Sequence, residues 1–156
     1  MKEIIELIER DSVFGLSKHL ELLKKTDDEG NTALSIAFDY RGSDAMINAL
    51  LKVNNYKQVN NLGISPFEKA VIKGRTEWVK KFIEMGVDVN HTERESNFTA
   101  LMGAVTAGRT EIVKILLENG AYIHEKDSFG FSPLDFARKM KKEEILKILE
   151  EEDLKR

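Results

Sequence analysis

Two stretches of this sequence are nearly copies of each other and begin 34 residues apart: GRTEWVKKFIEMGVDVN at Gly74 and GRTEIVKILLENGAYIH at Gly108. Eight of their seventeen paired positions are identical, and most of the others exchange one apolar residue for another. A fixed period of about 20–50 residues is typical of stacked repeat proteins, in which each unit buries its apolar face against its neighbours. This repetition constrains the fold more than any other feature of the chain.

Four segments share the same turn and helix start: DEGNTALSIAF, NLGISPFEKAV, ESNFTALMGAV and SFGFSPLDFAR. Their starting residues are spaced by 33, 34 and 33 positions. In each segment, a residue that tolerates positive φ precedes a Thr or Ser by two positions, which predicts a turn leading into a helix N-cap. The turn residues are Gly30, Gly63, Asn97 and Gly130, and the caps are Thr32, Ser65, Thr99 and Ser132. Pro66 and Pro133, the only prolines, directly follow two of these caps at the first helical position.

A second helix follows each first helix. Its apolar residues recur at helical spacing, as in EIVKILLE, and Gly86 and Gly120 are expected to end it in a left-handed turn. Trp78 takes the place of Ile112 on the apolar face of such a helix, so we expect it to be buried rather than to bind a ligand. The repeat unit is therefore predicted to be a helix pair joined to the next by a loop.

This unit resembles the ankyrin repeat, whose motifs are T-P-L-H-x-A and E-I-V-K-L-L-L-E-x-G-A-D-V-N. The match is close at 99–104 and at 111–123, although another residue replaces the motif histidine in every repeat. The resemblance implies an all-α solenoid of stacked helix-turn-helix units with outward loops, forming one domain over residues 1–156. Its expected parts are an N-terminal capping helix pair in 1–26 and repeats at 27–59, 60–93, 94–126 and 127–156, the last ending in a capping helix.

Composition excludes several kinds of chemistry. The chain has no cysteine, which removes disulfides and thiolate zinc sites, and its net charge of -3 argues against nucleic acid as a partner. The N-terminal MKEIIELIERDS lacks the uninterrupted apolar stretch of a signal or membrane-spanning segment, so we expect a cytoplasmic protein with no membrane partner.

His91 and His124 occupy nearly equivalent loop positions with acidic residues nearby. One interpretation is a weak surface metal site, and the other is ordinary loop variation. Loop variation explains both histidines, and we predict no metal, no cofactor and no catalytic residue.

The resemblance also implies a binding surface, made of the loop tips and the last turn of each first helix. The expected partner-binding residues are Asn31, Asp39, Tyr40, Arg41, Leu62, Ile64, Ile72, Lys73, Glu95, Phe98, Thr106, Phe129, Phe131, Lys139 and Met140. Ile64, Phe98 and Phe131 each follow the turn residue of their repeat, so stacking is expected to align them in one apolar row. The alternative is that these side chains fill gaps between loops.

The function that the sequence favours is binding of a folded protein partner through the concave face, by a monomer that performs no chemistry. An inhibitor or immunity protein that occludes a toxin or enzyme is one concrete form. Two alternatives stay open: an ankyrin scaffold subunit of a larger regulatory assembly, and a metal-binding or ligand-binding protein or enzyme with a site near His91 and His124.

Overall fold

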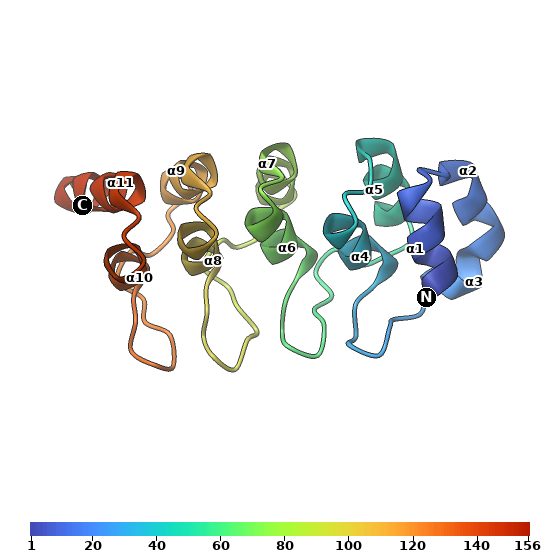
Figure 1. Cartoon of the computed structure of the whole chain (residues 1–156), viewed down its shortest axis with the longest axis horizontal. Coiled ribbons are helices and arrows are strands. Elements are labelled where there is room, and N and C mark those ends of the chain that lie inside the picture. Colours follow the sequence, from blue (N-terminus) through green and yellow to red (C-terminus); the bar gives the residue numbers. More distant parts are fainter. The chain divides into compact units, whose positions relative to one another are not determined.

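The computed structural model describes residues 1–156 and is helical, with no β-strand, which confirms the all-α class (Figure 1). The chain forms two compact units, Met1–Lys69 and Ala70–Arg156. In chain order the helices are α1 Lys2–Glu9, α2 Val13–Leu16, the 3-10 helix η1 Ser17–His19, α3 Leu20–Leu23, α4 Ala33–Asp39, α5 Asp44–Leu51, α6 Pro66–Lys73, α7 Thr76–Glu84, α8 Ala100–Thr106, α9 Thr110–Glu118, α10 Pro133–Lys139 and α11 Glu143–Lys155. Helix α6 begins in the first unit and ends in the second.

The first unit begins with the cap, where α1 buries Ile4 and Ile8 and packs against α2 and α4. The second helix expected here is not continuous, because α2, η1 and α3 replace it. Gly15 and Ser17 lie in this segment, and both residue types favour a helix less than Ala or Leu does. The Ser17 hydroxyl also donates to the carbonyl of Phe14 at 2.8 Å, a local bond that competes with regular helix hydrogen bonding.

His19 links the two parts of this cap. Its Nδ1 lies 2.9 Å from the carbonyl oxygen of Gly15, and its Nε2 lies 2.7 Å from a carboxylate oxygen of Glu3. Both partner atoms can only accept, so both ring nitrogens must donate for both bonds to form, and this requires the imidazolium. The backbone bond to Gly15 and the Glu3 carboxylate raise the pKa of His19 above 6.5, against the opposing effects of desolvation and, less strongly, of Lys18.

A pH dependence follows from this shift. Because the folded-state pKa of His19 is raised, its stabilising contribution is complete below about pH 6.5, the unfolded value, and is lost as pH rises through the folded-state pKa. The melting temperature of the wild type should therefore fall relative to that of His19→Gln as pH rises from about 6 to 8. Parallel pH dependences of the two melts would contradict the assignment, and an NMR titration of the ring gives the pKa directly.

Each repeated helix pair starts as the sequence predicts. The hydroxyls of Thr32, Thr99 and Ser132 accept from the backbone N–H three residues on, and Ser65 does the same for Glu68 at 3.2 Å. The predicted turn residues Gly30, Gly63, Asn97 and Gly130 all have positive φ. Local chemistry at the loop ends therefore sets where each first helix begins.

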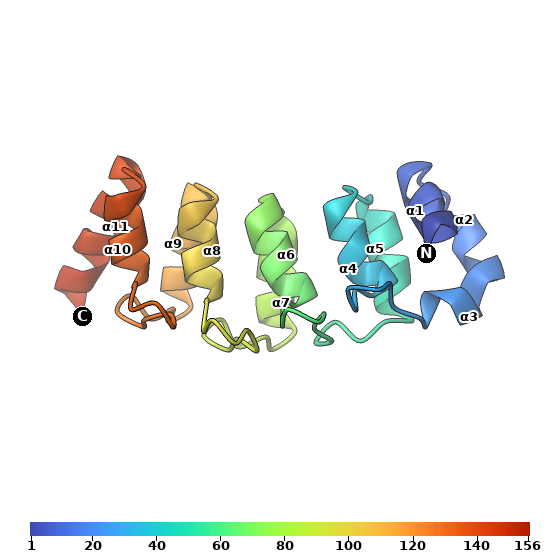
Figure 2. The same cartoon turned by 60° about the horizontal axis from the view of Figure 1, so that its bottom comes forward.

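The second unit consists of two helix layers, with α8 and α10 in one and α7, α9 and α11 in the other (Figure 1). Figure 2 shows α8 and α10 side by side, with their preceding loops at their N-terminal ends. The small side chains of Ala104 and Ala137 are fully buried, and Trp78 is 2 % exposed, as expected for core packing. Gly86 and Gly120 end α7 and α9 at φ 92° and 81°, as predicted.

Candidate functional site

The tips of the long loops are held by side chains that accept two backbone hydrogen bonds each. In the loop before α10, Oδ1 of Asp127 accepts from the N–H groups of Phe129 at 3.0 Å and Phe131 at 2.9 Å. Asp27 and Asn60 do the same in the two loops of the first unit. Because these bonds are made within the chain, the loop side chains are positioned before any partner binds.

Three aromatic rings meet in the second unit and form what we call the aromatic cluster: Phe98, Phe131 and Phe136. Phe136 of α10 lies between the other two, with ring centroids 5.6 Å from Phe98 in an edge-to-face arrangement and 5.8 Å from Phe131. All three rings are half-buried. Phe129, two residues before Phe131, is 79 % exposed. The cluster thus presents apolar area to solvent beside a ring that is almost fully exposed.

Cationic side chains cover two of these rings. Nζ of Lys139 lies 4.5 Å from the centroid of Phe131, and the guanidinium of Arg94 lies 5.0 Å from that of Phe98. Both distances are within the range of cation–π attraction. The two contacts give this apolar surface a positive rim.

Gly103 lies in the middle of α8, next to Phe98. A Cβ added there would lie 3.5 Å from Cγ1 of Ile72 and 3.7 Å from Cε1 of Phe98, both ordinary van der Waals distances. Glycine in a helix interior costs about 1 kcal/mol relative to alanine. The site therefore has room for a side chain that would favour the helix.

Gly103→Ala is expected to raise the free energy of unfolding by about 0.5–1 kcal/mol. Gly130→Ala is the matched control. Space is open around Gly130, but its φ of 86° is one that an L-residue rarely adopts, so this change should lower the free energy of unfolding by about 1 kcal/mol. Denaturant titrations of the two variants should shift in opposite directions. Shifts of the same sign would mean that backbone geometry does not decide the effect.

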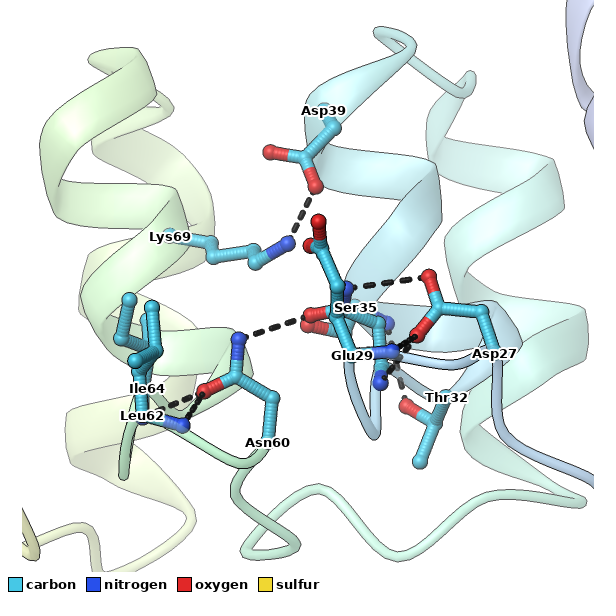
Figure 3. A network of polar contacts seen from close by, with 10 residues as sticks. Asp27, Glu29, Thr32, Ser35, Asp39, Asn60, Leu62, Ile64 and Lys69 are labelled. Carbon is cyan, nitrogen blue, oxygen red and sulfur yellow. Dashed lines mark hydrogen bonds and ion pairs between the residues drawn. The ribbon is translucent and has the colours of Figure 1, made fainter.

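The corresponding part of the first unit is a polar network, shown in Figure 3. Nδ2 of Asn60 donates to Oδ1 of Asn31 at 2.9 Å, and Nδ2 of Asn31 donates to the carboxylate of Asp27 at 3.0 Å. Lys69 of α6 forms an ion pair with Asp39 of α4. The bonds Asn60–Asn31 and Lys69–Asp39 each join residues about one repeat apart, so the polar groups of neighbouring repeats are paired with each other.

The Asp27 carboxylate is the centre of the first loop. Burial raises its pKa, but the hydrogen bonds from the side chain and backbone of Asn31 and from the backbone of Glu29 outweigh burial, and the pKa of Asp27 is lowered. Asp135 behaves similarly in the capping box of α10, where the Ser132 backbone N–H and hydroxyl lower its pKa. Both carboxylates are thus ionised acceptors with structural roles.

Two of the expected partner-binding residues, Asn31 and Asp39, form bonds within this network. Asn31 is only 4 % exposed, so the expectation of an outward-facing loop side chain is wrong there. Its amide is used in bonds to Asp27, Glu29 and Asn60 instead. Asp39 is half-buried and paired with Lys69, which gives its carboxylate a partner inside the chain.

The other expected residues divide by exposure. Ile64, Ile72 and Thr106 are half-buried, and the Thr106 hydroxyl donates to the carbonyl of Gly103 at 3.1 Å. The exposed ones are Tyr40, Arg41, Leu62, Lys73, Glu95, Phe129, Lys139 and Met140. Phe98 and Phe131 are joined through Phe136 in the second unit, whereas Ile64 belongs to the first unit. The part of the predicted row that starts at Ile64 therefore stays a prediction.

Each of the two loop histidines has one carboxylate neighbour. Nε2 of His91 lies 3.4 Å from Glu93, and Nε2 of His124 lies 2.7 Å from Asp153 of α11. A depression of about 470 Å³ adjoins His124 and is lined also by Tyr122 and Arg156. No group of three or more His, Cys, Asp or Glu side chains is placed to hold a metal ion.

Sequence reasoning missed four residues that matter here: Asn60, Lys69, Asp127 and Phe136. Asp27, Asn60 and Asp127 each stand three positions before a turn glycine, and this recurring Asx position could have been found in the sequence. Phe136 and Lys69 occupy one position of the repeat, which is Ile36 and Gly103 in the other two repeats. Because the four residue types differ, the repeat pattern does not identify a role for this position.

Comparison with known proteins agrees with this geometry. A family model described as ankyrin repeats, in three copies, matches residues 67–155, more than half of the chain. The chain belongs to the ankyrin-repeat family. It is 30% identical over 148 residues to the human transient receptor potential cation channel subfamily A member 1, a match covering 94% of this chain and 13% of the channel. It is 41% identical over 69 residues to the mouse 2-5A-dependent ribonuclease, covering 44% and 9%.

A third relative is a putative ankyrin repeat protein of Rickettsia bellii, 49% identical over 55 residues, covering 35% of this chain and 19% of that protein. The chain spans less than a fifth of the length of each of these relatives. Ankyrin repeats generally mediate protein–protein interaction and are generally not catalytic. No helix of this chain is both long and apolar enough to cross a membrane.

The ankyrin motif histidine is replaced by Ser35, Glu68, Met102 and Asp135, and the structure shows three uses of the position. Glu68 and Asp135 accept from the backbone N–H groups of their N-cap residues, and in α8 the sulfur of Met102 accepts from the backbone N–H of Thr99. Ser35 differs, because its hydroxyl is buried and has no hydrogen-bond partner. Ser65 and Glu68 thus form a capping box at the start of α6.

Proposed function

We propose that this ankyrin chain binds a folded protein partner through the face formed by its loop tips and first helices. The centre of the contact is the aromatic cluster together with Phe129. The observation that carries the proposal is the exposure of Phe129, at 79 %, beside three half-buried rings. Exposed aromatic area gathered in one place is a usual property of protein-binding sites, whereas scattered exposed apolar residues are not informative.

The geometry also favours a rigid binding surface. The backbone of the Phe129 loop is bonded to the buried carboxylate of Asp127, and Phe131 and Phe98 are held by ring contacts with Phe136. Little ordering entropy would be lost when a partner binds to a surface that is already formed. A scaffold of this kind suits occlusion of another protein, and an inhibitor or immunity protein is the form that we propose.

The alternative is a scaffold role within a larger regulatory assembly. The three relatives described above are much longer than this chain, which is the arrangement expected of repeats that serve as part of a larger protein. A monomeric state, a cytoplasmic location and a single domain with the boundaries given above belong to the same proposal. The third reading, a site near His91 and His124, has only isolated pairs of side chains to support it.

Photo-crosslinking tests the proposal directly. A benzoylphenylalanine placed at position 129 should crosslink one protein in extracts of the cells that make this chain, because that ring would lie within the contact. The matched control carries the same group at position 114, an exposed lysine of α9 in the other helix layer. Equal crosslinking from both positions, or none from position 129, would contradict the proposed site.

A further inference from the structure

The charge around the aromatic cluster differs from that of the whole chain. Residues 126–142 carry five basic residues and two acidic ones, a net charge of +3, whereas the chain carries -3. Both acids are used internally: Asp127 holds the loop that bears Phe129, and Asp135 caps α10. The adjoining exposed acids, Glu95, Glu125, Glu143 and Glu144, lie outside this range, and the last two stand beyond the end of α10. The exposed charges within the segment are therefore all positive.

The cations of this segment form few ion pairs within the chain. Lys139 is exposed, lies over Phe131 and forms no ion pair, and Lys141 is exposed at φ 53° with no ion pair either. Arg138 is the exception, since it contacts Glu150 at 3.3 Å. A lysine beside an aromatic surface and without a carboxylate is available to a partner's carboxylate, and desolvation on binding would strengthen that pair.

Resting on the function proposed above, we infer that the partner segment docking on Phe129, Phe131 and Lys139 is an acidic peptide stretch that carries an aromatic or large aliphatic residue. The apolar side chain packs on the exposed Phe129 and the edge of the cluster, and the flanking carboxylates pair with Lys139 and Lys141. The opposite charge pattern occurs at 27–43, with four acids and one base, so no such segment is expected to dock there.

Nucleic acid is the other class of partner that basic and aromatic side chains serve. The observations favour a peptide because stacked bases are bound along a continuous basic groove, whereas the exposed cations here are few and the chain is acidic as a whole. A 12-nucleotide single-stranded DNA is thus the competing probe. Binding of that DNA as tightly as the best peptide would overturn the inference.

Selection of random 12-residue peptides on phage, with the intact chain as target, tests the inference without a known partner. Enriched peptides should combine Asp or Glu with Phe, Trp or Leu, and their synthetic forms should bind in a fluorescence anisotropy titration. Lys139→Glu with Lys141→Glu should weaken that binding by about tenfold or more, and so should an increase in salt. The control pair Lys25→Glu with Lys114→Glu makes the same charge change at exposed lysines elsewhere and should leave the binding unchanged.

The outcomes separate this inference from the proposed function. Two results would contradict the acidic chemistry without contradicting the binding surface. In the first, the enriched peptides fail to bind the Phe129→Ser variant but show no excess of acidic residues. In the second, they bind the Lys139→Glu variant as they bind the wild type. Peptides that bind the Phe129→Ser variant as well as the wild type would overturn both. Failure to enrich any peptide would overturn the acidic-peptide inference, while crosslinking from position 129 would still report on the proposed surface.

Discussion

Replacing Phe129 with Ser is expected to weaken binding of the crosslinked partner by about 2–4 kcal/mol, or roughly 30-fold to 1000-fold in Kd. The ring is 79 % exposed in the free chain, so little of its area is buried in the fold. Surface substitutions of this kind change stability by about 0.5 kcal/mol or less, and the melting temperature should therefore move by only about 1–2 °C. Calorimetric binding titrations and thermal melts on the same preparation measure both effects.

Phe136→Ser is the matched comparison within the same surface. Phe136 contacts both other rings of the cluster and is half-buried, so its loss should lower the free energy of unfolding by roughly 2 kcal/mol as well as weaken binding. If Phe129→Ser destabilised the fold as much as Phe136→Ser does, Phe129 would have a structural role. Unchanged affinity in the Phe129→Ser variant would remove that residue from the binding site.

The double change Phe98→Ser with Phe131→Ser shows how the structure alters a prediction. From the sequence, these rings either face a partner, with hardly any effect on the melting temperature, or fill gaps, with a large one. Both rings are half-buried against Phe136, with solvent on their other side. We therefore expect both effects together, a loss of affinity and a loss of roughly 1–3 kcal/mol in unfolding free energy for each ring.

Removal of residues 127–156 is expected to have the largest effect on the fold. Helix α8 packs against α10 and α9 against α11, so the deletion uncovers apolar side chains on the flank of the preceding repeat. Repeat proteins are stabilised mainly by contacts between neighbouring repeats, and a terminal repeat needs a polar outer face. We expect aggregation in size-exclusion chromatography, with a melting temperature lower by about 10 °C or more.

A rescue experiment controls for this deletion. A consensus repeat with a polar outer helix, joined at position 127, should restore the monomer and most of the helical signal, because it covers the same flank. A deleted chain that stayed monomeric and fully helical would show that 94–126 does not need the following repeat. Loss of helical signal even with the consensus repeat would point to a specific role of α10 and α11.

Much of the fold could be predicted because its signals are local. The N-caps Thr99 and Ser132, the positive φ of Asn97 and the helix-ending glycines each depend on bonds within a few residues. The 33- to 34-residue period then implies that the same unit recurs, so a correct prediction of one helix pair applies to the others as well. The break of the second cap helix into α2, η1 and α3 was missed because weak helix formers lower helix preference without specifying where a helix stops.

By itself, the sequence determined the repeat, the starts of the first helices in the four repeats and the family, since these follow from residue types at fixed short spacings. Only the tertiary structure decided which side chains face solvent. The Asn31 amide accepts from Asn60 and is therefore not free to bind a partner, whereas Phe98 and Phe131 are joined through Phe136. The contacts Asn31–Asn60 and Phe98–Phe136 each join residues about one repeat apart. A repeat pattern shows where such positions recur. Whether a side chain is free to bind depends on the residue that the neighbouring repeat places opposite it, because hydrogen-bond partners and ring contacts are made across that distance rather than along the chain.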